Sequence, residues 1–158
     1  MRLEKQLSKK TSLEQMRQKC LKAFQLLRRL EEADEFGYCT CISTGKRIYY
    51  KECDGGHYIS RACRATELEH DNVWPQSKYA NRYLHGDYHN YRDKLIDKIG
   101  LDRVERLEDL RRAWEGNQDV EIAEEDKHLL LKRTKVYYAE KYKEINKQVK
   151  QLKSDKCL

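Results

Sequence analysis

Residues 53–61 hold the side chains best suited to chemistry in this sequence. They read Cys-Asp-Gly-Gly-His-Tyr-Ile-Ser-Arg. His57 can accept or donate a proton near neutral pH, and Asp54 adds a carboxylate close by. Gly55 and Gly56 let the backbone turn sharply and approach a ligand closely. These residue types would suit acid–base catalysis by His57. The alternative is a half-buried histidine in a glycine turn, which is the commoner meaning of an isolated Gly-Gly-His.

A second polar segment, residues 72–81, begins and ends with an asparagine. It reads Asn-Val-Trp-Pro-Gln-Ser-Lys-Tyr-Ala-Asn, and the run Leu84–Asp87 follows it. Together with the segments on either side, the two stretches resemble the phage NinG (Rap) recombination proteins, which are relatives of the HNH nucleases. The resemblance covers roughly residues 24–110 in one order along the chain, so it is more specific than any single motif.

The resemblance implies a role for each polar residue of these two segments. His57 matches the glycine-histidine of the family and is expected to be the general base. Asn72 matches the middle asparagine, which would tie the loop together and orient the histidine. Asn81 stands where a related junction resolvase uses an asparagine as metal ligand, and Asp54 is the nearest carboxylate to complete the site. We expect the cation to be Mg²⁺ or Mn²⁺, and we expect catalysis by phosphodiester hydrolysis.

The elements that must position these residues are mostly helical. Ser12 and Gln15 form a capping-box pattern before a run of apolar residues at helical spacing, and Gly37 is the expected stop. The apolar residues of this run are Leu13, Met16, Cys20, Ala23, Phe24, Leu27 and Leu30. They predict a first amphipathic helix.

The middle of the chain predicts a β-hairpin followed by a loop and a helix. Residues 47–51 are rich in strand formers, and we expect them to pair with residues 57–59 across a turn at Asp54-Gly-Gly. Residues 60–76 lack a clear period and hold the only proline, so we expect a loop there. From about Tyr79 helical spacing returns, and it ends at Gly100.

Two more helices are expected after residue 100. Asp102 is the expected cap of the first, which carries Val104, Leu107, Leu110 and Trp114 on one face. The second should begin near Leu131 and carry a narrow apolar seam at Tyr138, Tyr142, Ile145, Val149 and Leu152. This seam should lie on the first helix or on another copy of the chain, so a homodimer through the long C-terminal helix is an open alternative.

These elements give an α+β fold that is predominantly helical. The resemblance implies that its core is a small ββα-metal unit of the HNH, or His-Me finger, type. We expect an N-terminal amphipathic helix within residues 1–37, the core within 38–100, and C-terminal helices with a basic arm within 101–158. We expect apolar packing to hold this core together in place of a metal, around Ile48, Tyr50, Val73, Trp74 and Leu95.

The positive charge is concentrated near the C-terminus. The whole chain has a formal net charge of +6, and residues 127–156 hold ten Lys or Arg against three acidic residues. Such a basic arm indicates an anionic partner, most commonly nucleic acid; a lysine-rich solvated helix without a partner is the alternative. We expect DNA contacts from the arm and from basic residues around the site: Lys141, Lys143, Lys147, Arg61, Arg64, Lys78 and Arg82. Tyr79 and Tyr83 are available to stack on unpaired bases.

The six cysteines indicate free thiols or metal ligands instead of disulfides in an intracellular protein. The resembled family holds a zinc with two C-x-x-C pairs, and these four positions fall here on Cys41, Thr44, Ser77 and Ala80. Hydroxyl and methyl groups cannot replace thiolates as zinc ligands. We therefore expect no structural zinc, with one alternative left open, a zinc held in another way by Cys39, Cys41 and Cys53.

Two functions from different classes follow. The first is a metal-dependent endonuclease of phage recombination that hydrolyses phosphodiesters in branched or Holliday-junction-like DNA. The second is a non-catalytic DNA-binding or scaffold protein on a degenerate HNH fold, which is favoured by Trp74, where many members of the resembled family have histidine, and by the missing zinc cysteines. Gly56 also stands where nucleases of this class often have a metal ligand. No apolar run reaches the ~20 residues of a membrane span, so we expect no membrane partner and a cytoplasmic protein in a phage-bearing bacterial host.

Overall fold

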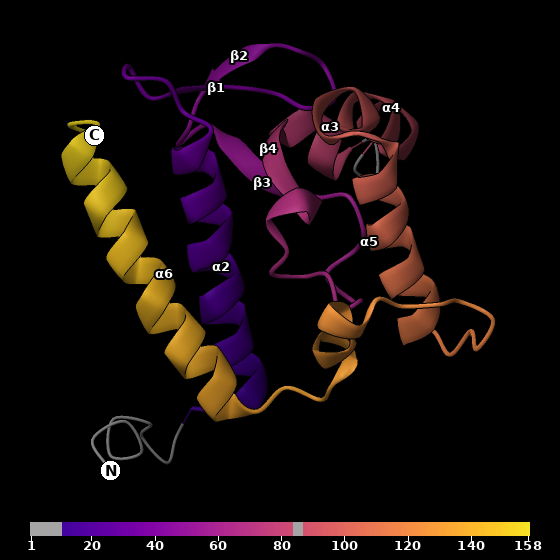
Figure 1. The fold of residues 1–158 in the computed structure, drawn as a ribbon. Coiled ribbons are helices and arrows are strands. Elements are labelled where there is room, and N and C mark those ends of the chain that lie inside the picture. Colours follow the sequence, from indigo (N-terminus) through magenta and orange to yellow (C-terminus); the bar gives the residue numbers. More distant parts are fainter. Residues whose placement is uncertain (1–10, 84–86) are drawn as a thin grey trace.

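The computed structural model describes residues 11–83 and 87–158. Residues 84–86 of the second motif, and the first ten residues of the predicted N-terminal segment, lie outside this part of the chain. Two long helices, α2 and α6, lie on one side of the short strands, and helices α3 to α5 lie on the other (Figure 1). The predicted α+β class with a predominance of helix is confirmed.

Helix α2 spans Leu13–Glu31, as its apolar spacing predicts. The Ser12 hydroxyl accepts a hydrogen bond from the Gln15 amide at 3.1 Å, and the Gln15 side chain accepts one from the Ser12 amide at 2.8 Å. This reciprocal pair satisfies two amides that would otherwise have no partner at the start of the helix. The apolar residues of the helix form one buried face.

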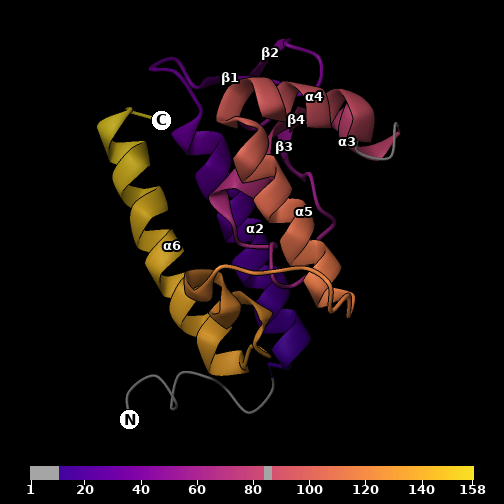
Figure 2. The same cartoon turned by 45° about the vertical axis from the view of Figure 1, so that its right-hand side comes forward.

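Helix α6, Lys135–Asp155, begins later than the expected Leu131, because Thr134 caps it by accepting a hydrogen bond from the Tyr137 amide. Its seam of Tyr138, Ile145 and Val149 packs on α2 of the same chain. The two helices run side by side in both views (Figures 1 and 2). The Lys156 ammonium donates hydrogen bonds to carbonyls at the C-terminal end of α2. The C-terminal ends of α2 and α6 therefore lie together, and the two helices run parallel. The seam therefore packs on the first helix, which was one of its two expected partners. A homodimer through α6 stays a prediction.

The expected hairpin is wrong. Strand β1 (Tyr38–Thr40) pairs with β2 (Arg47–Tyr49), and β3 (Cys53–His57) pairs with β4 (Val73–Ser77), both antiparallel. The two glycines therefore lie inside strand β3 and form no turn. A Cβ atom at Gly55 would lie 2.9 Å from the Cα atom of Gln25, and one at Gly56 would clash with the Gln76 side chain. Close packing of α2 on the strand requires glycine here.

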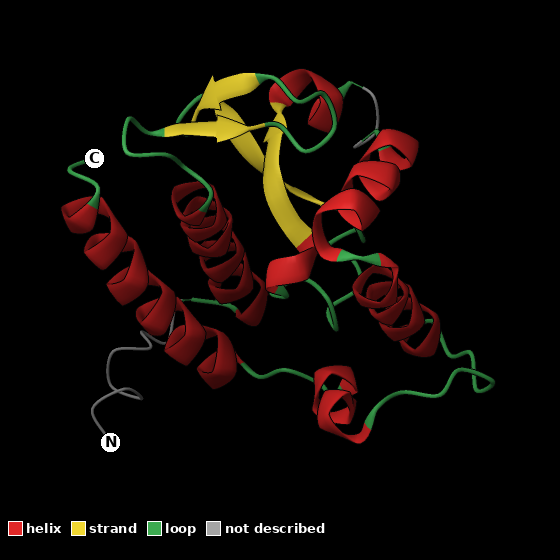
Figure 3. Ribbon diagram, turned by 45° about the horizontal axis from the view of Figure 1, so that its top comes forward, coloured by secondary structure: helices red, strands yellow, loops and turns green. Residues whose placement is uncertain are grey.

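The predicted loop over residues 60–76 is wrong at its end, because β4 occupies residues 73–77. A proline is typical of a loop, but Pro75 lies opposite Gly55 in the strand pair and its carbonyl accepts a hydrogen bond from the Ile42 amide at 2.9 Å. The 3₁₀ turn η1 (His70–Asn72) leads into β4. Helix α3 (Lys78–Arg82) follows β4 directly, so strand, strand and helix come in the order expected of the core. Figure 3 shows the two small strand pairs beside the helices.

The strand pair β3–β4 separates two apolar clusters. One lies between α2, α6 and the strands and includes Tyr50 and Val73, with Ile48 packed against it. The other lies under α4 and α5 and includes Trp74 and Leu95. Successive side chains of a strand point to opposite faces, so Val73 and Trp74 serve different clusters. The residues expected to form one core are thus divided between two apolar clusters.

Helices α4 (Tyr88–Ile99) and α5 (Leu101–Trp114) match the expected apolar spacing. Gly100, at φ +89°, is the N-cap of α5, so the predicted cap at Asp102 is wrong and that residue lies in the first turn. A second 3₁₀ segment, η2 (Glu124–Leu130), joins α5 to α6. Among the described helices, none is long and apolar enough to cross a membrane.

Candidate active site

One pocket gathers most of the residues expected at the site. It has a volume of about 520 Å³ and opens between α2, β3, the loop after β3 and α3. His57, Asp54 and Asn81 line it, together with Gln25, Arg29, Gly55, Ser60, Arg61 and Arg82. The close packing of α2 on Gly55 brings the two α2 side chains to this pocket. Its lining is rich in arginine, so the pocket suits an anionic ligand.

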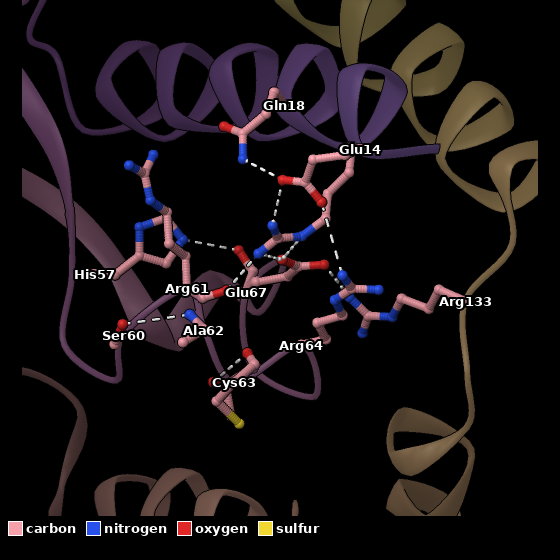
Figure 4. A network of polar contacts seen from close by, with 12 residues as sticks. Glu14, Gln18, His57, Ser60, Arg61, Ala62, Cys63, Arg64, Glu67 and Arg133 are labelled. Carbon is pink, nitrogen blue, oxygen red and sulfur yellow. Dashed lines mark hydrogen bonds and ion pairs between the residues drawn. The ribbon is translucent and has the colours of Figure 1, made fainter. Parts of the chain in front are cut away.

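The backbone of the loop before β4 orients His57. The Nε2 atom of its ring lies 2.9 Å from the carbonyl oxygen of Glu67. A carbonyl only accepts hydrogen bonds, so Nε2 carries the proton and Nδ1 carries the free lone pair. Nδ1 lies on the side of the ring away from Glu67 (Figure 4). Burial lowers the pKa of His57 below its ordinary value, although the carbonyl of Glu67 opposes this. The ring is neutral at pH 7 and able to accept a proton.

Asp54 and Asn81 meet across the pocket from different elements. The Asn81 Nδ2 atom donates to the Asp54 Oδ2 atom at 2.9 Å, which leaves the amide oxygen of Asn81 as an acceptor. Arg82 donates to both carboxylate oxygens, at 3.1 and 3.3 Å. The side chain of Asp54 is 20% exposed and that of Arg82 is 61% exposed. A half-buried carboxylate is thus held by an amide and by an arginine whose side chain is mostly exposed.

The oxygen atoms of this pair fit a hard cation. Mg²⁺ is commonly bound through one or two carboxylates together with waters and substrate phosphates. The described residues contain no group of three or more His, Cys, Asp or Glu side chains that could hold a metal ion. Asp54 and the amide oxygen of Asn81 would therefore hold a cation jointly with the substrate, and Arg82 would have to release the carboxylate.

Asn72 is fully buried, and its side chain joins two parts of the loop after β3 by hydrogen bonds. Its Nδ2 atom donates to the carbonyls of Ile59 and Thr66, both at 3.0 Å, and its Oδ1 atom accepts from the Ile59 amide at 2.7 Å. Its own carbonyl accepts from the Tyr58 amide at 2.9 Å. Since the loop also carries the carbonyl that holds His57, Asn72 acts on the histidine through the backbone.

We expect Asn72→Ala to lower the free energy of unfolding by about 2–3 kcal/mol, because it leaves buried backbone groups without partners. Denaturant unfolding followed by circular dichroism would measure this change. Asn117→Ala is the matched control, because Asn117 is exposed and its side chain accepts one hydrogen bond from the Asp119 amide. Equal effects of the two substitutions would contradict a special role for Asn72.

A buried carboxylate, Glu67, connects this loop to both long helices, and Figure 4 shows its contact with Arg133 just before α6. One of its oxygens accepts a hydrogen bond from Arg17 of α2 at 2.8 Å. The other accepts from Arg133 at 3.2 Å and from the Tyr138 hydroxyl of α6 at 2.5 Å. Its backbone carbonyl holds His57. Helix packing and histidine orientation therefore depend on the same residue, which the sequence analysis did not single out.

The remaining basic residues lie at different places. Arg61 and Arg82 line the pocket, whereas Lys78 is exposed on α3 outside it. Arg64 does not line the pocket and lies 3.7 Å from Glu14. The expected arm residues, Lys141, Lys143 and Lys147, are on α6, and Figure 1 shows α2 between that helix and β3. The arm is therefore a separate surface.

The comparison with protein families matches almost the whole chain. A family model described as the bacteriophage lambda NinG protein covers residues 1–155. The chain belongs to this family. Neither the curated proteins nor the solved structures contain a match to the chain. The predicted resemblance is thus confirmed, and NinG is a family of phage recombination proteins.

In this NinG family member, hydrogen bonds connect the two segments on which the zinc-ligand positions of the resembled family fall. The Cys41 sulfur accepts a hydrogen bond from the Ser77 amide at 3.2 Å, and the Ser77 hydroxyl caps α3 by accepting from the Ala80 amide. Burial raises the pKa of the Cys41 thiol, but hydrogen bonds from Thr44 and Ser77 outweigh it, so the net shift is downward. Hydrogen bonds thus join the β1–β2 turn to the start of α3, at the place where a bound metal would otherwise join them. The absence of zinc stays a prediction.

Trp74, where the NinG resemblance led us to expect histidine, does not line the pocket. Its indole Nε1 atom donates to the Asp71 carbonyl at 2.8 Å, and its ring is 7% exposed. The Arg28 and Lys98 side chains lie over the ring at 4.6 and 4.7 Å from its centre. The tryptophan therefore packs in the apolar cluster under α4 and α5. It takes no place in the lining of the pocket.

Two lining residues of α2, Gln25 and Arg29, are not among the predicted site residues. Arg29 donates to the carbonyls of Tyr50 and Cys53 at 2.7 and 3.1 Å, and so fixes the start of β3 against the helix. A polar residue pointing from a helix toward a strand has no local signature. The only available signal was Gly55, which permits α2 to pack closely on β3 and so brings Gln25 and Arg29 to the pocket.

Proposed function

We propose that this NinG family protein is a metal-dependent endonuclease that hydrolyses phosphodiesters in branched or Holliday-junction-like DNA. The observation that supports it is the pocket that joins a neutral histidine, an Asp54–Asn81 oxygen pair and several arginines. Such a set offers a base, ligands for a cation and contacts for phosphate in one place. Residence in the cytoplasm of the bacterial host accords with this role and is part of the proposal.

The pocket residues divide the reaction among them. Arg61 and Arg82 hold phosphate oxygens and place the phosphorus near His57. The Nδ1 atom of His57 takes a proton from a water molecule whose oxygen attacks the phosphorus. The bond from phosphorus to the leaving sugar oxygen breaks, and that oxygen takes a proton from solvent. A divalent cation held by Asp54 and Asn81 would stabilise the negative charge on the phosphate and on the leaving oxygen.

The basic arm on α6 is proposed as a further phosphate-binding surface. Lys143 and Lys147 are exposed, while Lys141 lies 3.1 Å from Glu144. Because the arm is separated from the pocket by α2, it would hold a second stretch of the same DNA. Contacts of this kind bind without regard to sequence and weaken with salt.

The alternative function is DNA binding without catalysis, and one observation favours it. Arg82 engages both oxygens of Asp54, so the carboxylate has a charge partner without any cation. A protein that kept this ion pair while bound to DNA would hold a junction and leave it uncut. The two functions differ in whether cleavage occurs and whether it needs a metal.

A cleavage assay on a labelled four-way junction, beside linear duplex, separates the two functions. We expect cleavage with Mg²⁺ or Mn²⁺ and none with EDTA. Tight binding of the junction without cleavage under any metal would support the non-catalytic alternative. Cleavage that persists in EDTA would contradict the proposed role of the cation.

In the same assay, Asp54→Ala and Asn81→Ala should shift the metal dependence. Each removes one oxygen ligand, so a higher Mg²⁺ or Mn²⁺ concentration should restore part of the rate. Asp93→Ala is the matched control, because Asp93 is an exposed carboxylate of α4 outside the pocket. A rate that falls equally at every metal concentration would contradict metal binding by this pair.

A further inference from the structure

Helix α3 presents two different faces beside the pocket. Ala80 is fully buried and fixes the helix on the strands, while Asn81 and Arg82 line the pocket. Tyr79 and Tyr83 lie on the outer face, with 63% and 74% of their surfaces exposed. This short helix and its C-cap residue, Tyr83, therefore carry residues of the site and two exposed aromatic rings.

The two rings lie against each other. Their centres are 5.8 Å apart and their planes differ by 29°, which is a stacked arrangement. Neither hydroxyl has a hydrogen-bond partner within the part of the chain that the structure describes. The rings thus contribute little to the packing of the fold, and they keep flat apolar surface in contact with water.

Unpaired nucleobases are the ligand that this surface fits. Any base has a flat π-face that stacks on an aromatic ring whatever its sequence. In a duplex the bases are stacked on each other inside the helix, and only an unpaired base can lie on an outward-facing tyrosine. Lys78 and Arg82 flank the rings on the same helix and offer positive charge to the adjoining phosphates.

We propose that Tyr79 and Tyr83 form a stacking site for an unpaired base of DNA next to the strand that enters the pocket. The proposal rests on the proposed function for the identity of that strand, and the branched DNA it concerns is the kind that has unpaired bases beside the scissile phosphate. Stacking itself requires neither the cation nor cleavage. Binding in EDTA therefore tests it independently of the nuclease activity.

The experiment measures binding in EDTA to a single-stranded oligothymidine and to a fully paired duplex. The double substitution Tyr79→Ala with Tyr83→Ala should weaken single-strand binding by about 5- to 150-fold. Duplex binding, which depends on the basic residues, should stay within about twofold. Tyr79→Phe with Tyr83→Phe should bind as the wild type, because stacking needs the ring and not the hydroxyl. Phe36→Ala, which removes another exposed aromatic ring, should have no effect.

A second measurement needs only the wild-type protein. A DNA with 2-aminopurine at an unpaired position should lose fluorescence on binding, because the base stacks on a ring. Equal loss of single-strand and duplex binding in the double alanine variant, or unquenched 2-aminopurine in the wild-type complex, would overturn the stacking site. A wild type that quenches the probe but never cuts DNA would overturn the nuclease proposal and leave this one standing.

Discussion

His57→Ala is expected to cleave junction DNA about 10²- to 10⁴-fold more slowly than the wild type, since it removes proton transfer by a positioned base. Binding of the same DNA should change little, because the substitution leaves Arg61, Arg82 and the basic arm in place. Single-turnover cleavage, together with a binding assay in EDTA, measures both quantities. A variant that keeps full activity would remove His57 from the mechanism.

Two controls separate the loss of a base from a loss of structure. His128→Ala removes an exposed histidine of η2 outside the pocket and should leave cleavage unchanged. Added imidazole should restore part of the rate of His57→Ala, because a free base can enter the space of the missing ring. Burial lowers the pKa of His57 below 6.5, and the base acts only when unprotonated. The rate should therefore rise with pH to a plateau, with its midpoint below pH 6.5.

Glu67→Ala is expected to lower the free energy of unfolding by about 3–5 kcal/mol, because it removes the buried carboxylate that two buried arginines share. Arg17 and Arg133 are each 7% exposed, and Glu67 is the carboxylate between them. For a chain of this size the melting temperature should fall by about 6–20 °C. Thermal unfolding followed by circular dichroism measures the change.

The matched control for this substitution is Glu52→Ala, which removes an exposed carboxylate from the turn before β3. It should leave the melting temperature nearly unchanged, since surface charges contribute little. Glu67→Gln should fall between the two, because the amide keeps a hydrogen-bond acceptor but loses the charge. If Glu67→Ala melted like the wild type, the two arginines would have found water or other partners.

The sequence predicted the long helices well because their signals are local. The capping box at Ser12 and the apolar spacing that follows it are complete within one segment, and both are present in α2. The strands were harder, because a pairing of five residues with a segment twenty residues away has no local mark. Two adjacent glycines predict a turn, whereas here Gly55 marks the contact of β3 with the backbone of Gln25 and Gly56 its contact with the Gln76 side chain.

The buried charges illustrate the same limit. Arg17 lies between Met16 and Cys20 on the apolar face of α2, and a buried charge at such a position requires a partner. This signal was available in the sequence. The identity of the partner was not, because Glu67 is separated from Arg17 by 50 residues and from Arg133 by 66.

By itself the sequence determined the family, the α+β class, the helices and the residue types of the site, because each of these is carried by a motif or by a local period. Only the tertiary structure decided that His57, Asp54 and Asn81 line one pocket with Arg29, and that Glu67 holds both the histidine and the helices. The physical reason is that these contacts join side chains far apart in the chain. Their distances depend on how closely α2 packs on β3, and this is a property of the whole fold.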